Sequence, residues 1–106
     1  MMTMAELFFG LDVPGRGPVT DAEWRDFSET ILSGAFPDGF TAYRVNGQWR
    51  DPRRHSIVRE PSMVVVVAAP PGSNLASSLQ AVARTYETRF HQQSVGIVTQ
   101  PACAEF

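Results

Sequence analysis

Hydrophobic and polar side chains alternate over residues 5–13, which places Leu7 and Phe9 on the same side of the chain. A period of two residues predicts a strand with one strongly apolar face. Two prolines and two glycines follow within residues 14–18, and these residues cannot continue a strand ladder. We therefore expect the first strand to end near Val13.

The next segment carries a signal for the start of a helix. Thr20 and Glu23 have the spacing of a capping box, in which each side chain bonds to the main-chain amide of the other residue. Trp24 and Phe27 follow at the spacing of a helix face. The pattern predicts an amphipathic helix over residues 21–33.

The middle of the chain predicts a second strand over residues 40–45. Asn46 and Gly47 form a turn signal after it, and residues 48–51 either pair back or continue the strand past a bulge. Residues 52–60 are polar and rich in arginine, which favours a loop.

The second half of the chain predicts two further strands and a second helix. Residues 62–69 contain an uninterrupted apolar run at residues 63–67, which is typical of a central strand covered on both faces. Apolar side chains at helical spacing over residues 75–90 predict a helix, and residues 93–99 predict the last strand.

The resulting order is strand, helix, strand, strand, helix, strand, which is the arrangement of ferredoxin-like α+β domains. Such a fold has a four-stranded antiparallel sheet with two helices on one face and the first and third strands in the middle. The 106 residues suffice for one such domain, so we expect a single domain over residues 1–106.

Two helices leave the other face of this sheet uncovered, although the third strand is apolar on both sides and the first strand adds Phe8 there. Contiguous exposed apolar surface usually marks an interface or a ligand groove. A second copy of the chain can cover the face in a homodimer. Alternatively, the C-terminal tail or residues 48–60 fold over it and enclose a pocket, or the partly exposed valines have no role.

Composition and charge exclude several classes. The chain is 43% hydrophobic with a net charge of −2, which does not fit disorder and gives no general attraction to nucleic acid. The longest apolar run, residues 63–71, is too short to span a membrane. All nine basic residues are arginine, which excludes lysine Schiff-base chemistry and a P-loop lysine. The lone Cys103 and the absence of a basic leader favour the cytoplasm.

The densest polar cluster lies in residues 48–62, where arginine forks suit a carboxylate or phosphate group. The candidate substrate-binding residues are Arg59, Arg50, Trp49, Tyr43 and Phe8. The two arginines would bind an acidic group, and the aromatic side chains would form apolar walls. The alternative is a solvated loop in which Arg50 or Arg59 pairs with Asp51 or Glu60.

The candidate catalytic residues are Glu60, His55 and Glu6, which could transfer protons if the fold places them in a cleft. The alternatives are an ion pair at the start of a strand for Glu60, and a pair with Arg44 for Glu6. The histidines and the cysteine lack the spacing of metal ligands, so we expect no metal site. No dinucleotide or phosphate-loop fingerprint is present, and we expect no cofactor.

Several blocks of the sequence resemble a bacterial family, domain of unknown function 3574. They are residues 6–10, residues 36–41, residues 47–49, residues 59–62 and residues 86–95. The resemblance spans nearly the whole chain. It implies no activity, cofactor or catalytic residue, so it leaves the function open.

Two functional hypotheses follow. The first is a homodimeric α+β barrel protein that binds a small acidic organic molecule and acts on it by cofactor-free acid–base chemistry, as an isomerase, cyclase or lyase. This step depends on analogy between folds. The second is a non-enzymatic interaction module that docks another protein on the open sheet face. An enclosed cavity with titratable groups would favour the first hypothesis, and a flat apolar face the second.

Overall fold

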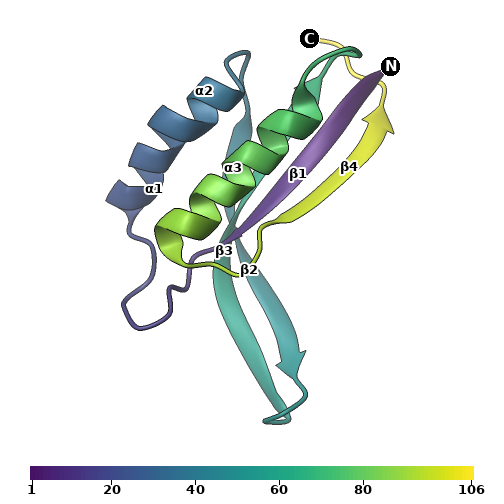
Figure 1. The fold of residues 1–106 in the computed structure, drawn as a ribbon. Helices are drawn as coiled ribbons and strands as arrows, with labels where there is room; N and C mark the ends of the chain where they lie inside the picture. Colours follow the sequence, from purple (N-terminus) through teal and green to yellow (C-terminus); the bar gives the residue numbers. More distant parts are fainter.

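Four antiparallel strands form one sheet, and the helices pack against one of its faces (Figure 1). The computed structural model describes residues 1–106. Its elements are β1 (Met2–Gly10), α1 (Asp21–Phe27), the π-helical η1 (Ser28–Leu32), α2 (Ser33–Ala35), β2 (Thr41–Asp51), β3 (Ser56–Ala69), α3 (Leu75–Phe90) and β4 (Gly96–Ala102). The strand order is β2-β3-β1-β4, so β1 and β3 are central and β2 and β4 are the edges. The predicted ferredoxin-like α+β fold is confirmed.

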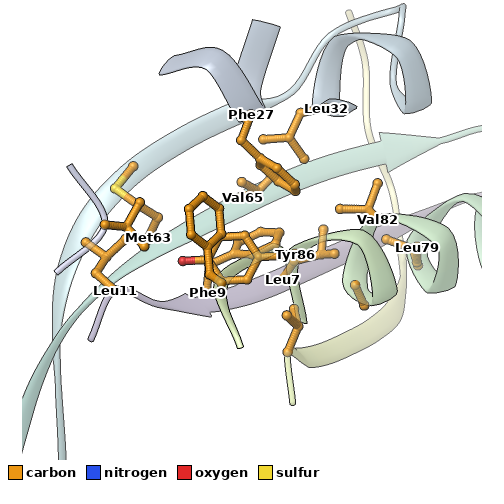
Figure 2. Close-up of a cluster of buried hydrophobic side chains, with 14 of the residues drawn as sticks. Leu7, Phe9, Leu11, Phe27, Leu32, Met63, Val65, Leu79, Val82 and Tyr86 are labelled. Atoms are coloured by element: carbon orange, nitrogen blue, oxygen red, sulfur yellow. The ribbon is translucent and has the colours of Figure 1, made fainter. Parts of the chain in front are cut away.

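The core lies between the sheet and the helices. On the central strands, Leu7 is paired with Val65 and Phe9 with Met63, and all four side chains are buried. Figure 2 shows Leu7, Phe9 and Val65 gathered with Tyr86 of α3, and Met63 beside Leu11. The Phe9 and Tyr86 rings meet edge to face, with 4.8 Å between their centroids. Alternation on β1 and helical spacing on α3 therefore bury one joint apolar layer.

The first helix begins where its capping signal predicts. The Thr20 hydroxyl accepts a hydrogen bond from the Glu23 amide at 3.1 Å, and the Glu23 carboxylate accepts one from the Thr20 amide at 3.0 Å. The backbone stays helical through η1 into α2, so the predicted helix over residues 21–33 is confirmed. The sequence did not predict the π-helical turn at Ser28–Leu32. A π-helical turn is wider than an α-helical turn, but one such turn changes the spacing of the apolar residues too little to be recognised in the pattern.

The β2–β3 hairpin is much longer than the sequence predicts. Asn46 pairs with Pro61 and Gly47 with Glu60, so the predicted turn at Asn46 and Gly47 is wrong. The predicted loop over residues 52–60 is confirmed for residues 52–55, which form the turn, and is wrong for residues 56–60, because β3 already begins at Ser56. Of the two readings for residues 48–51, continuation of the strand is the one observed, and its register has no bulge.

We call residues 47–60 of this hairpin the arm. The pairing between β1 and β3 ends at Gly10 and Ser62, so the arm strands pair only with each other. Figure 1 shows the arm extending beyond the rest of the sheet. The turn at its tip includes His55 with a positive φ of 53°.

The remaining element ends differ from the predictions by a few residues. β1 ends at Gly10, although Leu11 and Val13 are still buried beneath the helices. The last strand begins at Gly96 rather than Gln93, because His91 ends α3 in a left-handed conformation and a short loop follows. None of the helices has the length and apolar character needed to cross a membrane.

Candidate functional site

The sheet face that points away from the helices is uncovered, and we call it the open face. Strand alternation and register assign to it Met4, Glu6 and Phe8 of β1, Tyr43 of β2, Val64 and Val66 of β3, and Val98 of β4. Phe8, Tyr43 and Val98 are 41%, 45% and 51% exposed. The chain alone therefore leaves an apolar surface in contact with water.

One side chain of the open face is buried nonetheless. Val64 is paired with Phe8 on one side and with Tyr43 on the other, and it is 3% exposed. The two aromatic side chains are its cross-strand neighbours and shield it from water. As predicted, β3 is central, but Val66 and Ala68 stay half-buried because nothing lies above them.

Glu6 is the one charged side chain among these open-face residues. Its cross-strand neighbours are Val66 and Val98, and the residue is half-buried. No ion pair includes Glu6. The anticipated pair with Arg44 does not form, because Arg44 lies on the other side of the sheet and binds Asp21 at 3.0 Å. The Glu6 carboxylate is therefore available to a ligand.

Glu60 is held in place at the base of the arm. Its Oε2 accepts a hydrogen bond from the Asp12 amide at 3.2 Å. The carboxylate occupies the space beside Gly10, where a Cβ atom would lie 2.6 Å from Oε2. A glycine in a strand often marks such a close approach, and this was the sequence signal that could have identified Gly10.

The peptide at Gly10 is also contacted from the core. The Tyr86 hydroxyl donates a hydrogen bond to the Gly10 carbonyl at 2.6 Å. Burial, with smaller contributions from the negative charges of Glu60 and Glu23, raises the pKa of Tyr86 above its ordinary value. The hydroxyl therefore stays protonated and acts as a donor.

The arm separates charge between its two sides. Trp49 is paired with Val58 on the side that continues the open face, and its side chain is 53% exposed. Arg50 and Arg59 occupy alternate positions, so they belong to the opposite side. His55 is exposed in the turn at the tip. The arginines predicted to bind an acidic group therefore do not share a side with the predicted aromatic walls.

The predicted site residues form two groups rather than one. Along β3, the partner of Glu6 is Val66 and the partner of Trp49 is Val58. At roughly 3.3 Å per residue, these positions are about 26 Å apart along the strand. The sheet group contains Glu6, Phe8 and Tyr43, and the arm group contains Trp49, Arg50, His55, Arg59 and Glu60.

Sequence reasoning did not single out Val66 and Val98, which flank Glu6 and make its surroundings apolar. A cleft of about 260 Å³ lies elsewhere, between the end of α2 and the start of α3, and none of the candidate residues lines it. No three His, Cys, Asp or Glu side chains lie close enough together to hold a metal ion.

Comparison with known proteins identifies the family of the chain and solved structures with a similar fold. The family model "Protein of unknown function (DUF3574)" matches residues 4–106. A search of curated proteins finds no match. Among solved structures, a phage SAM lyase in complex with S-methyl-5'-thioadenosine is 19% identical, with a TM-score of 0.71 over 93% of this chain and 80% of that chain.

A second solved structure of similar fold is a phage SAM lyase in the apo state, which is 18% identical to this chain. Its TM-score is 0.67 over 92% of this chain and 78% of that chain. At these identities the likeness shows a shared fold. Those two proteins are lyases that act on a small molecule, SAM.

Proposed function

Because the chain belongs to the DUF3574 family of proteins of unknown function, its activity must be inferred from its own residues, and we propose that it binds a small organic molecule on the open face. We propose further that it acts on this molecule by cofactor-free acid–base chemistry, as a lyase, isomerase or cyclase. The expected location is the cytoplasm.

The observation that carries the proposal is the position of Glu6. Its carboxylate is half-buried between Val66 and Val98 and belongs to no ion pair. A charged group that loses water without gaining a partner costs free energy. A ligand that supplies a cation or a hydrogen-bond donor at this point recovers that cost, which favours binding beside Glu6.

The chemistry of the open face favours a cationic ligand over the acidic one expected from the sequence. The charged residues at its strand positions are Glu6, Asp51 and Glu60, and all are acidic. An anionic ligand would be repelled there. The ring faces of Phe8 and Tyr43 attract cations, because the face of an aromatic ring carries partial negative charge.

The phage SAM lyases suggest a concrete member of this class. SAM carries a sulfonium cation that a ribose joins to a flat purine ring, and S-methyl-5'-thioadenosine is its neutral thioether fragment. The cation suits the Glu6 carboxylate, and the purine suits stacking against Phe8 or Tyr43. We propose SAM as the first ligand to test.

A balanced elimination can be written for Glu6 as a general base. Its carboxylate takes a proton from the carbon next to the carbon bound to sulfur, and the C–H electron pair forms a carbon–carbon double bond. The C–S bond breaks at the same time, and its electron pair moves to sulfur, which turns the sulfonium into a neutral thioether. No cofactor, oxidant or water is consumed.

Titration calorimetry with SAM and with S-methyl-5'-thioadenosine tests this proposal. We expect the wild type to bind SAM, and Glu6→Gln to bind it at least about tenfold more weakly. Glu29→Gln, a matched change on the exposed surface of η1, should leave binding unchanged. Chromatographic detection of the thioether reports turnover. If the wild type binds neither molecule, the sulfonium class is refuted, and equal binding by Glu6→Gln refutes the role of Glu6.

We also propose that the open face is covered by a second copy of the chain in a homodimer. In an isolated chain, Phe8, Tyr43 and Val98 are largely exposed. Leaving this apolar surface in water costs free energy that a second copy would recover by covering it. Light scattering after gel filtration measures the state directly. A mass of two chains or more is expected at micromolar concentration, and a clean mass of one chain would contradict the homodimer.

A further inference from the structure

Glu6 of the sheet group and Trp49 of the arm group cannot contact the same small ligand within one copy. The partner positions of Glu6 and Trp49 on β3 are eight residues apart, or about 26 Å at roughly 3.3 Å per residue. A molecule of the size of a nucleoside does not span this separation. If Trp49 and Glu6 serve one ligand, they must come from different chains.

Beyond Glu60, which the Asp12 amide holds at the base, the arm has no strand partner outside itself. Its two strands pair only with each other, and isolated two-stranded hairpins are marginally stable in water. Trp49 is 53% exposed and Ile57 is 42% exposed, so each side of the arm presents a large apolar side chain to water. Packing against another molecule would bury these side chains and hold the arm in one position.

We propose that the arm of one copy lies over the open face of a second copy, so that each binding site is built from two chains. Trp49 of one copy then lies beside Glu6 and Phe8 of the other and closes the site. This inference rests on the proposed function for the identity of the ligand, whereas the contact between arm and open face can be tested without any ligand.

The available area fits an interface that includes the arm. At about 4.8 Å between strands and roughly 3.3 Å per residue, the four-stranded open face offers about 500 Å² of flat area. A stable interface typically takes about 800 Å² from each partner. The five residue pairs of the arm add about a third to the area of the face, since a two-stranded ribbon is about 10 Å wide.

Charge complementarity also favours this contact. The arm contains four arginines and two carboxylates, whereas the rest of the chain contains five arginines and nine carboxylates. The arm therefore has a positive net charge and the remaining body a negative one. At the tip, Arg54 pairs with Asp51 at 3.6 Å, whereas Arg53 is exposed, belongs to no ion pair and can approach the body of a second copy, where Glu6 is unpaired. Attraction between unlike net charges favours arm against body.

Cross-linking tests the contact directly. In a Cys103→Ser background, one preparation carries Phe8→Cys and a second, of different mass, carries Trp49→Cys. A short bismaleimide should link the two preparations on mixing and give a species with the summed mass. Thr85→Cys, on the exposed side of α3, is the matched control and should not link to Trp49→Cys. Absence of the Phe8–Trp49 product, or equal linking to the Thr85 variant, would overturn the proposal.

Subunit mixing tests whether the two chains share a site. Glu6→Gln and Trp49→Ala should each weaken SAM binding. After random mixing, half of the pairs contain one of each variant, and each such pair has one intact site, so about a quarter of the wild-type sites should reappear. No recovery would place both residues in one chain and refute the shared site. Failure of the wild type to bind SAM would instead count against the proposed function, and the cross-linking result would stand by itself.

Discussion

Replacing Tyr86 with phenylalanine isolates one partly buried hydrogen bond. The aromatic ring is retained in the cluster with Phe9 and Phe27, while the Gly10 carbonyl loses a donor at 2.6 Å. An unmatched buried polar group costs about 1–3 kcal/mol, and we expect the free energy of unfolding to fall by about 2 kcal/mol. For a domain of this length, each kcal/mol lowers Tm by about 4–8 °C.

Urea unfolding followed by circular dichroism at neutral pH measures this loss. Tyr43→Phe is the matched control, since Tyr43 is 45% exposed and makes no hydrogen bond that holds the fold, and its change should stay within about 0.5 kcal/mol. If Tyr86→Phe were as stable as Tyr43→Phe, the hydrogen bond to Gly10 would not contribute to stability.

The pH dependence gives an independent check on Tyr86. Burial raises the pKa of Tyr86 in the folded state above the ordinary value of 10.0, so the unfolded chain releases this proton first. The stabilisation that comes from this raised pKa is fully present below pH 10. As the pH rises above 10, the tyrosine of the unfolded chain ionises, and the free energy of unfolding falls by up to about 1.4 kcal/mol per pH unit. Tyr86→Phe should show a flatter alkaline limb than the wild type. An identical limb would show that Tyr86 titrates alike in both states.

Two further predictions concern the ends of the first helix and of β1. A hydrogen bond from Arg16 lowers the pKa of Glu23 to about 2, so Glu23 stabilises the fold above its ordinary value of 4.5 and this contribution is lost as the pH falls towards 2. Unfolding experiments across this range should show a flatter acid limb for Glu23→Gln, and an unchanged limb would contradict the assignment. Gly10→Ala should cost about 0.5–1.5 kcal/mol, because its methyl group displaces the Glu60 carboxylate and breaks the hydrogen bond from the Asp12 amide. Gly34→Ala, which meets nothing within 4 Å, is the control, and equal effects would refute this displacement.

The fold could be predicted where local pattern and tertiary contacts agree. The apolar run at residues 63–67 favours a central strand, and the structure buries three of its residues against the helices. Helical spacing at Trp24 and Phe27 likewise predicts the face that packs on the sheet. In these segments the apolar side chains that define the sequence pattern are also the ones that form the core. The pattern alone therefore predicts both the element and its buried face.

The hairpin could not be predicted because its local signal and its pairing disagree. Asn46 and Gly47 are a strong turn signal by themselves. Pairing of Trp49 with Val58 and of Arg50 with Ile57 continues the ladder past that point, and this choice depends on residues distant in the sequence. A turn at residues 46–47 would have brought the arm residues close to the sheet group.

For the candidate site, the sequence could predict which residue types take part but not all of their positions. The sequence identified Glu6, Phe8 and Tyr43 as candidates, and the register brings these three onto one face. It could not show that Arg50 and Arg59 occupy the opposite side of the arm, because side assignment in a strand changes with every residue of register.

The two edges of the sheet differ in how they resist fibril growth. β4 contains Pro101, which has no amide hydrogen to offer to another strand. β2 is eleven residues long, has no proline and leaves its outer amides and carbonyls without strand partners. The guanidinium groups of Arg44 and Arg50 are therefore the main feature of β2 that opposes strand addition, because identical strands stacked on each other would bring these like charges together. High ionic strength screens these charges and should make this edge the weak point for aggregation.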